Sequence, residues 1–203
     1  MNKVTKRLLT FFIGIPLILL LVIVKFQNHL LLNVTVVAAS LLTTVELYNL
    51  FSTKTKLFPK TVFMAFNFLI TALSYTLYAT GYPHDISHWI LLLCSFCFLG
   101  TEALTQKDFT KSIEKISLSL FILFYSGYLF TFVTKLCVLE HSEYFISLFF
   151  ILVFMCDSAA WFFGILFGKS TRGFIKASPN KSIVGFIGGI ISSTLCGIIV
   201  LYI

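Results

Sequence analysis

The sequence predicts an all-α, polytopic transmembrane helical bundle with about seven spans, and its composition and hydropathy pattern support this fold class. Of the 203 residues, 58% are hydrophobic and only 11% are charged, whereas soluble domains usually carry about a quarter charged residues. The apolar stretches are continuous, which excludes a transmembrane barrel of alternating strands. The polar remainder is too small for a soluble catalytic domain, so the spans and their short loops must carry any chemistry.

Seven apolar runs bounded by charged residues give the expected spans. Each is close to the roughly 20 residues that cross an apolar core about 30 Å thick. The runs are Leu8–Val24, Leu30–Leu50, Val62–Thr80, Trp89–Leu104, Ile116–Thr134, Phe145–Phe167 and Ile183–Ile203. The first follows basic residues as a signal peptide would, but no small-residue cleavage site follows, so we interpret it as an uncleaved span. We expect residues 1–203 to form a single integral membrane domain.

The basic residues predict the orientation of these spans. Of the 15 Lys and Arg residues, all but Lys25 and Lys135 lie at the amino terminus or in the second, fourth and sixth loops. They are Lys3, Lys6, Arg7, Lys54, Lys56, Lys60, Lys107, Lys111, Lys115, Lys169, Arg172, Lys176 and Lys181. The positive-inside rule then places the amino terminus in the cytoplasm. The formal charge of +7 reflects topology and attraction to anionic headgroups and does not indicate nucleic acid binding.

Asp157 stands apart from the other acidic residues because it lies deep inside an expected span, Phe145–Phe167, and not near its end. It precedes Lys169 by about eleven residues, or roughly 16 Å of helix. A carboxylate at that depth costs on the order of 2.5 to 3.5 kcal/mol, so it requires a partner, a water-filled cavity or a metal. A hydrogen bond to Ser or Tyr of a neighbouring span is one explanation. We favour a functional role because Asp157, Trp161, Gly164 and Gly168 share one helical stripe.

Small residues next to Asp157 predict a closely packed neighbouring helix. Ala160, Gly164 and Gly168 recur at every fourth position, a pattern that lets helix backbones approach in lipid. The last span offers a matching small and partly polar face. This face consists of Gly185, Gly188, Gly189, Ser192, Ser193, Cys196 and Gly197. We therefore expect a cavity that is floored by these two spans and contains the carboxylate.

The connection between these two spans, GKSTRGFIKASPNKS from Gly168 to Ser182, is where we expect phosphate to bind. Ser178 is a favourable helix cap and Pro179 a favourable first helical residue, so the last helix is predicted to start there. Its amino-terminal end would face the cytoplasm with Lys181 in the first turn. Further contributions are expected from the Ser178 and Ser182 hydroxyls and from nearby Lys169, Arg172 and Lys176. An ordinary basic cytoplasmic loop is the alternative interpretation.

Two groups of residues in the last third of the chain match patterns of a known family. The first group is Asp157, Ala160, Trp161, Gly164, Gly168 and Lys169, and the second is Ser178, Pro179, Lys181, Gly185, Gly188 and Gly189. Lys6, Arg7 and Glu46 also look like this family. On these residues the chain resembles the phosphatidate cytidylyltransferases, or CDP-diacylglycerol synthases, of bacterial membranes.

Several positions depart from the family pattern. Asn180, Ser182 and Val184 stand where the pattern has Lys, Thr and Glu. The family's later cytoplasmic segment, with its metal-binding aspartates, is also missing. One interpretation is therefore that the chain is a truncated form of a longer domain, without activity as given.

The resemblance implies that CTP and phosphatidic acid condense to CDP-diacylglycerol and pyrophosphate in phospholipid biosynthesis, with Mg²⁺ as cofactor. It places a multi-pass enzyme in the cytoplasmic (inner) membrane and allows a homodimer. Asp157 and Lys181 would be catalytic, with Asp157 also a metal ligand. The residues implied in substrate binding are Lys169, Arg172, Ser178, Ser182, Gly185, Gly188 and Gly189.

Two other functions remain open at this stage. A CTP-dependent kinase acting on polyprenol or phytol would share a membrane Asp and a Ser-rich loop. A small ion or solute transporter, from a different class, would use Asp157 as a proton or cation site between packed helices.

Overall fold

The computed structural model describes residues 13–81 and 86–202 as helices joined by short loops. Six helical stretches in these ranges are long and apolar enough to cross a membrane. They are Leu30–Ser52, Lys60–Ala79, Ile86–Thr105, Ser112–Leu136, Ser142–Leu166 and Ile183–Val200. They match the second to seventh predicted spans within a few residues, which confirms a multi-pass helical membrane fold.

The first predicted span is described only in part. Helix α2 covers Ile15–Ile23 and has Pro16 in its first turn, a position where the missing proline N–H costs no helical hydrogen bond. The start of this predicted span, together with Lys3, Lys6 and Arg7, lies outside the described residues. The membrane side of the amino terminus therefore stays a prediction.

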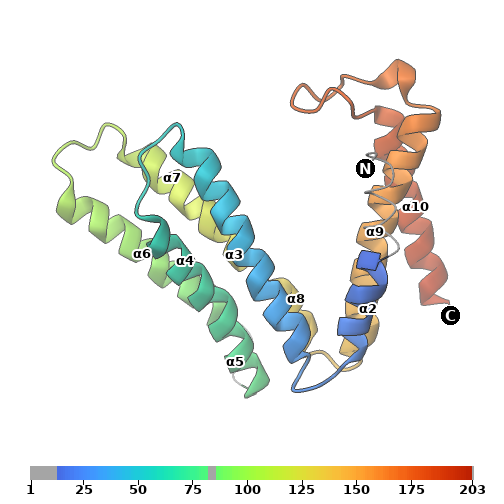
Figure 1. Cartoon of the computed structure of the whole chain (residues 1–203), viewed down its shortest axis with the longest axis horizontal. Coiled ribbons are helices and arrows are strands. Elements are labelled where there is room, and N and C mark those ends of the chain that lie inside the picture. Colours follow the sequence, from blue (N-terminus) through green and yellow to red (C-terminus); the bar gives the residue numbers. More distant parts are fainter. Residues whose placement is uncertain (1–12, 82–85, 203) are drawn as a thin grey trace. The chain divides into compact units, whose positions relative to one another are not determined.

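The chain divides into two compact units, Met1–Ser142 and Glu143–Ile203. The expectation of one integral membrane domain stays a prediction. The helices of the first unit that follow α2 are α3 (Leu30–Ser52), α4 (Lys60–Phe68), α5 (Ser74–Ala79), α6 (Ile86–Thr105), α7 (Ser112–Leu123) and α8 (Thr131–Leu136). Figure 1 shows α3, α4, α6 and α7 side by side. Short π-helical segments connect α4 to α5 and follow α7.

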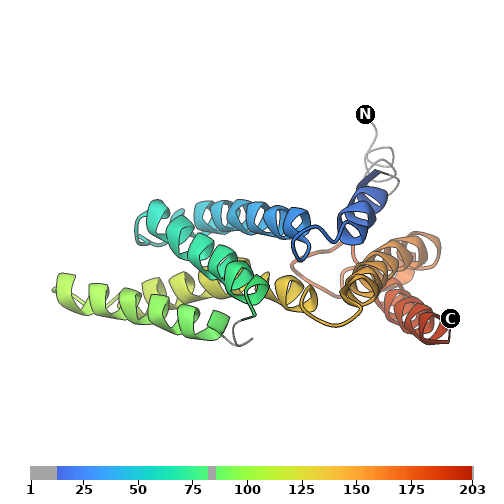
Figure 2. The same cartoon turned by 90° about the horizontal axis from the view of Figure 1, so that it is seen from below.

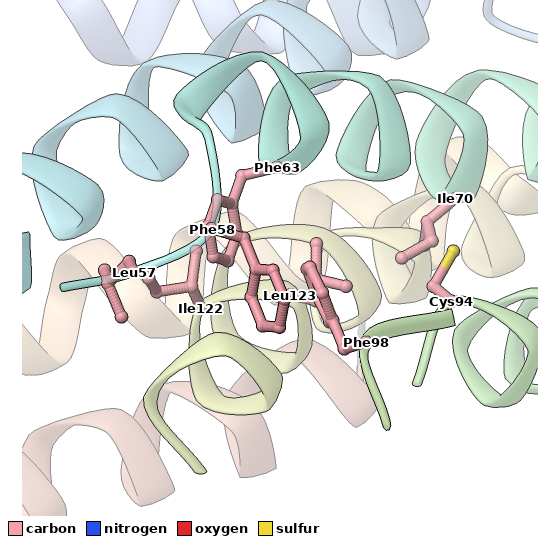
Figure 3. Close-up of a cluster of buried hydrophobic side chains, with 8 residues drawn as sticks. All are labelled: Leu57, Phe58, Phe63, Ile70, Cys94, Phe98, Ile122 and Leu123. Carbon is pink, nitrogen blue, oxygen red and sulfur yellow. The ribbon is translucent and has the colours of Figure 1, made fainter. Parts of the chain in front are cut away.

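An aromatic cluster forms the hydrophobic core of the first unit (Figure 3). The Phe98 ring of α6 stacks on Phe58, with ring centroids 4.7 Å apart, and packs at 5.2 Å against Phe63 of α4. The buried members of the cluster are Leu57, Phe58, Phe63, Ile70, Cys94, Phe98, Ile122 and Leu123. This core joins α4, α6 and α7 to the loop that precedes α4.

A second buried cluster in the first unit is polar and centres on Asn67, which is fully buried. Its Oδ1 accepts a hydrogen bond from Ser40 at 2.6 Å, and its Nδ2 donates to Thr44 at 2.5 Å and to Ser126 at 3.0 Å. Ser40 and Thr44 belong to α3, whereas Ser126 lies in the π-helical segment after α7. Because lipid offers no alternative partners, such bonds hold three spans together.

The connection from α2 to α3 has an unusual backbone. Gln27, Asn28 and His29 have positive φ angles of 44°, 52° and 59°, a region that non-glycine residues seldom adopt. The His29 ring is buried, and its Nε2 lies within hydrogen-bond distance, 2.9 Å, of Oγ of Ser142, the last residue of the first unit.

The second unit is a helical hairpin of α9 (Ser142–Leu166) and α10 (Ile183–Leu201). Both views show the two helices side by side, joined by the connection from Phe167 to Ser182 (Figures 1 and 2). At the other end of the hairpin, Tyr144 Oη donates a hydrogen bond to the Val200 carbonyl at 3.0 Å. The candidate site residues all lie in this hairpin.

Candidate functional site

The small residues of α9 and α10 bring the two helix backbones into close contact. A Cβ atom added at Gly185 would lie 2.5 Å from the Ala160 carbonyl oxygen, and one added at Gly189 would lie 2.8 Å from the Cys156 carbonyl oxygen. Gly164 in turn lies against Ser182 and Gly185. The close approach predicted from the spacing of these residues is therefore present. The absence of a side chain at Gly185 and Gly189 permits this helix contact. Their part in substrate binding stays a prediction.

Helix α10 begins with a serine cap, but not with the serine that the sequence predicted. Ser182 is the cap: it has extended backbone angles, and its Oγ accepts a hydrogen bond from the Gly185 N–H at 3.1 Å. This bond satisfies one of the four N–H groups that lack a helical partner at a helix start. The N–H groups of the first helical residues point to the same end and give it a partial positive charge.

The prediction that Ser178 caps this helix and that Pro179 is its first residue is wrong. These residues form a turn instead, in which the Lys181 N–H donates to the Ser178 carbonyl at 3.0 Å. Proline at the second position and asparagine at the third are both favoured in such a turn. Lys181 consequently precedes the cap and does not lie in the first helical turn.

The connection between the two helices is closed at its base. Arg172 and Ser182 form an antiparallel bridge, and Gly168 lies directly against the Ser182 side chain. Gly173 follows the bridge with a φ of +82°, a conformation that suits glycine. Lys169 follows Gly168, Lys181 precedes Ser182, and Arg172 pairs with Ser182. The fold therefore gathers their backbones around the start of α10.

Positive charge dominates this connection. Lys169, Arg172, Lys176 and Lys181 are all exposed, and the sequence from Phe167 to Ser182 contains no acidic residue. None of the four forms an ion pair with another residue in the described ranges. A capped helix start surrounded by unpaired cations can bind a phosphate or another polyanion.

Asp157 lies on α9 in the same hairpin, exposed at the helix surface. Its neighbours Cys156 and Ala160 contact Gly189 and Gly185, which places Asp157 roughly 9 Å below the Ser182 cap at 1.5 Å per residue. It makes no hydrogen bond or ion pair with any residue in the part of the chain that the structure describes. The fold therefore places Asp157 near the middle of α9 and Lys181 just before the start of α10, without joining them directly.

The surroundings of Asp157 limit the kind of metal site that it can form. Among the described residues, no group of three or more His, Cys, Asp or Glu side chains could hold a metal ion. Mg²⁺, however, is commonly bound by one or two carboxylates together with substrate phosphates and water. A single unpaired carboxylate near an anion site fits a shared Mg²⁺ site of that type, and not a site made by protein ligands alone.

Sequence reasoning missed the buried ion pair of the first unit. Glu102 of α6 is 3% exposed and accepts hydrogen bonds from Lys115 Nζ at 2.5 Å and from Ser112 Oγ at 2.7 Å. The Lys115 ammonium also lies 4.0 Å from the centre of the Phe58 ring. The sequence assigned Lys115 only to topology. Glu102 and Lys115 lie at the facing ends of two consecutive apolar runs, a position that is compatible with a pair but does not specify one.

Comparison with known proteins gives consistent similarities. Residues 5–203 match the model of the Cytidylyltransferase family. A phosphatidate cytidylyltransferase of Staphylococcus haemolyticus is 29% identical over 127 residues, which cover 59% of this chain and 47% of the relative. That of Staphylococcus saprophyticus is 25% identical over 126 residues, covering 59% and 46%. That of Aquifex aeolicus is 35% identical over 77 residues, covering 38% and 29%.

The matched segments span about half or less of the length of these curated relatives. No solved structure matches the chain. The family match nevertheless extends over almost the whole sequence, including the hairpin that carries Asp157 and Lys181. This chain therefore belongs to the Cytidylyltransferase family.

Proposed function

We propose that this chain condenses CTP with phosphatidic acid to form CDP-diacylglycerol and pyrophosphate at the inner leaflet of the cytoplasmic membrane. Family membership over residues 5–203 supports a cytidylyl transfer, and the relatives named phosphatidate cytidylyltransferase support the lipid acceptor. The spanning helices supply the membrane setting that a lipid acceptor requires.

The observation that carries the proposal is the cationic start of α10. Both substrates are phosphate anions, so the site that joins them must offset several negative charges. Lys169, Arg172 and Lys181 lie around the capped helix end without acidic neighbours in the connection. Backbone N–H groups, a helix dipole and fixed cations in one place favour a bound triphosphate.

The proposed reaction is an in-line displacement at phosphorus. An oxygen of the phosphatidate phosphate attacks the α-phosphorus of CTP, the bond from that phosphorus to the bridging oxygen of the β-phosphate breaks, and pyrophosphate leaves with the bonding electrons. Lys181 offsets the charge that develops on the triphosphate, and Arg172 and Lys169 hold its phosphates. The Ser182 hydroxyl accepts from Gly185 and still has its own proton to donate to a phosphate oxygen, as does Ser178.

Asp157 and the glycines complete the proposed site. Asp157 would hold Mg²⁺ together with the substrate phosphates, and the ion would supply charge neutralisation. Gly185, Gly188 and Gly189 keep α10 against α9, so that the helix start and Asp157 face the same substrates from one hairpin.

The test is to follow each phosphate of CTP separately. We would reconstitute the 203-residue chain in liposomes containing phosphatidate and Mg²⁺ and add CTP labelled on either the α- or the γ-phosphate. The proposal predicts that the α label enters lipid and that the γ label leaves in pyrophosphate. Liposomes with diacylglycerol in place of phosphatidate are the matched control and should give no labelled lipid.

Other outcomes would identify a different function. Transfer of the γ label to lipid would reject the proposal in favour of a lipid kinase. Ion or solute flux that does not depend on CTP, without any labelled lipid, would reject it in favour of a transporter.

A further inference from the structure

A shallow groove runs along the hairpin beside the helix contact. Its cavity volume is about 280 Å³. Phe163 of α9 lines one side, and the remaining lining residues, all on α10, are Val184, Ile187, Gly188, Ile191 and Ser192.

The groove exists because Gly188 has no side chain. A Cβ atom at this position would lie only 2.5 Å from Cδ2 of the Phe163 ring, so the ring lies over the bare helix backbone. The α10 residues that line the groove recur at intervals of three and four, which places them on one face of the helix. Phe163 forms one wall of the groove, and Ile187 and Ile191 rise beside it.

The lining is suited to hydrocarbon. It is apolar apart from the Ser192 hydroxyl, and Ile187 and Ile191 remain 49% and 53% exposed. From Val184 to Ser192 the groove follows about 12 Å of helix at 1.5 Å per residue. Its volume lies just below the range of about 300 to 1,000 Å³ that is typical of small-molecule pockets. These dimensions suit part of one hydrocarbon chain and not a whole diacyl lipid.

The position of the groove relates it to the candidate anion site. Val184 follows the Ser182 cap by two residues, so the groove begins directly beneath the cationic helix start. A phosphatidate phosphate that lies beside the CTP triphosphate at this helix start would have an apolar channel below it. In a lipid such as phosphatidate, a hydrocarbon chain likewise lies below the phosphate. The cationic helix start therefore complements the charge of the lipid phosphate, and the apolar groove complements its hydrocarbon chain.

We propose that this groove binds one acyl chain of the phosphatidate whose phosphate lies at the start of α10. The inference rests on the proposed function and adds the subsite for the lipid tail. Asp157 is not among the lining residues, and at 100° per residue it lies about 120° from Phe163 around α9. The acyl chain and the carboxylate therefore occupy different flanks of the hairpin.

Photolabelling tests the groove directly. The 203-residue chain would be reconstituted in phosphatidylcholine liposomes with a phosphatidate that carries a photoactivatable diazirine in one acyl chain. We expect label on Phe163, Ile187 and Ile191, and we expect excess unlabelled phosphatidate, but not extra phosphatidylcholine, to remove it. Label spread evenly around α10, or label that phosphatidate does not displace, would overturn the proposal, as would capture of Ile191 by another protein segment in place of lipid.

Two neighbouring isoleucines provide a matched pair of variants. Ile191 lines the groove and is 53% exposed, whereas Ile190 is 48% exposed and is not a lining residue. Filling the groove with Ile191→Trp should reduce displaceable labelling at Phe163 about tenfold, and Ile190→Trp should leave it unchanged. Equal labelling in both variants would count against the groove, and the competition experiment on the unmodified chain does not depend on either variant.

The two proposals can fail separately. Displaceable labelling without transfer of the α label from CTP would support the groove and reject the proposed reaction. In the opposite case, the α label is transferred at the same rate in Ile191→Trp and no displaceable labelling is found. That result would reject the groove and leave the proposed reaction supported.

Discussion

Ser182 both caps α10 and closes the base of the connection between α9 and α10. Its Oγ caps α10 by accepting from Gly185, and its backbone pairs with Arg172 across the base of the connection. Its side chain also lies against Gly164, where an added Cβ would be 3.2 Å from Ser182 Oγ. Ser182 is 8% exposed. A larger side chain at Gly164 or Gly185 would therefore disturb the cap. A buried cap of this kind holds the helix start in one position relative to α9.

Asp157 and Lys181 should affect catalysis differently. For Asp157→Asn we expect a loss of about 10²- to 10³-fold in kcat, the typical effect of removing one group that stabilises developing charge, together with a weaker Mg²⁺ dependence. For Lys181→Ala we expect a raised KM for CTP as well as a lower kcat, because in the proposed site this ammonium contacts the phosphates before and during the reaction. Steady-state rates of CDP-diacylglycerol formation at varied CTP and Mg²⁺ would measure both effects.

Lys176→Ala is the matched control for Lys181→Ala. It removes the same charge from the same exposed connection but lies away from the closed base, so its effect should be much smaller. Near-normal turnover in Asp157→Asn or in Lys181→Ala would reject the role assigned to that residue.

At the scale of the helices, the contact between α9 and α10 depends on missing side chains. Gly189→Ala would place a methyl group 2.8 Å from the Cys156 carbonyl oxygen and 3.0 Å from the Ala160 Cβ. Because one of these atoms belongs to the backbone, the helices must move apart. We expect a cost of about 1 to 3 kcal/mol from overpacking, which exceeds the gain of about 1 kcal/mol in helix propensity. Thermal unfolding in detergent should show a lower Tm.

Gly100→Ala is the control for this prediction. Gly100 also lies inside a helix, α6, but a Cβ atom there would meet nothing within 4 Å. Its substitution should therefore leave the Tm unchanged or raise it. If Gly189→Ala were equally harmless, the helix contact would not depend on this glycine.

The same comparison of elements explains which features could be predicted from the sequence. Continuous apolar runs located the helices from Leu30 onward, and the spacing of Ala160, Gly164 and Gly168 indicated a close helix contact that the structure contains. These features depend on local composition and periodicity.

The start of α10 and the buried ion pair required information that local sequence does not hold. Ser178-Pro179 suits a helix start and a turn equally well, and packing of Ser182 against Gly164 and Gly168 accompanies the turn. Glu102 and Lys115 meet only because two helices fold against each other, so neither position indicates a pair by itself.

At the scale of the whole molecule, the distribution of Lys and Arg predicts one cytoplasmic face. We would introduce single cysteines into a cysteine-free chain at exposed loop positions and treat intact cells with a membrane-impermeant maleimide. Thr53 and Ser170 should be protected, since they lie in the basic loops, and Glu140 should react. Permeabilised cells serve as the control in which all three must react. Labelling of Ser170 in intact cells would place the cationic helix start on the wrong side for CTP.

The closed base of the connection between α9 and α10 also affects the thermodynamics of anion capture. The Arg172–Ser182 bridge pins both ends of this connection, and backbone hydrogen bonds from Ser178 to Ile175 and from Lys181 to Ser178 close two turns between them, so the connection is ordered before a ligand arrives. Ordering a loop on binding costs roughly 1 to 2 kcal/mol per residue in backbone entropy, and here most of that ordering is complete after folding. The end of the hairpin that carries the proposed anion site is therefore prepared in advance, and a nucleotide arriving from water would meet a receptor that needs little rearrangement.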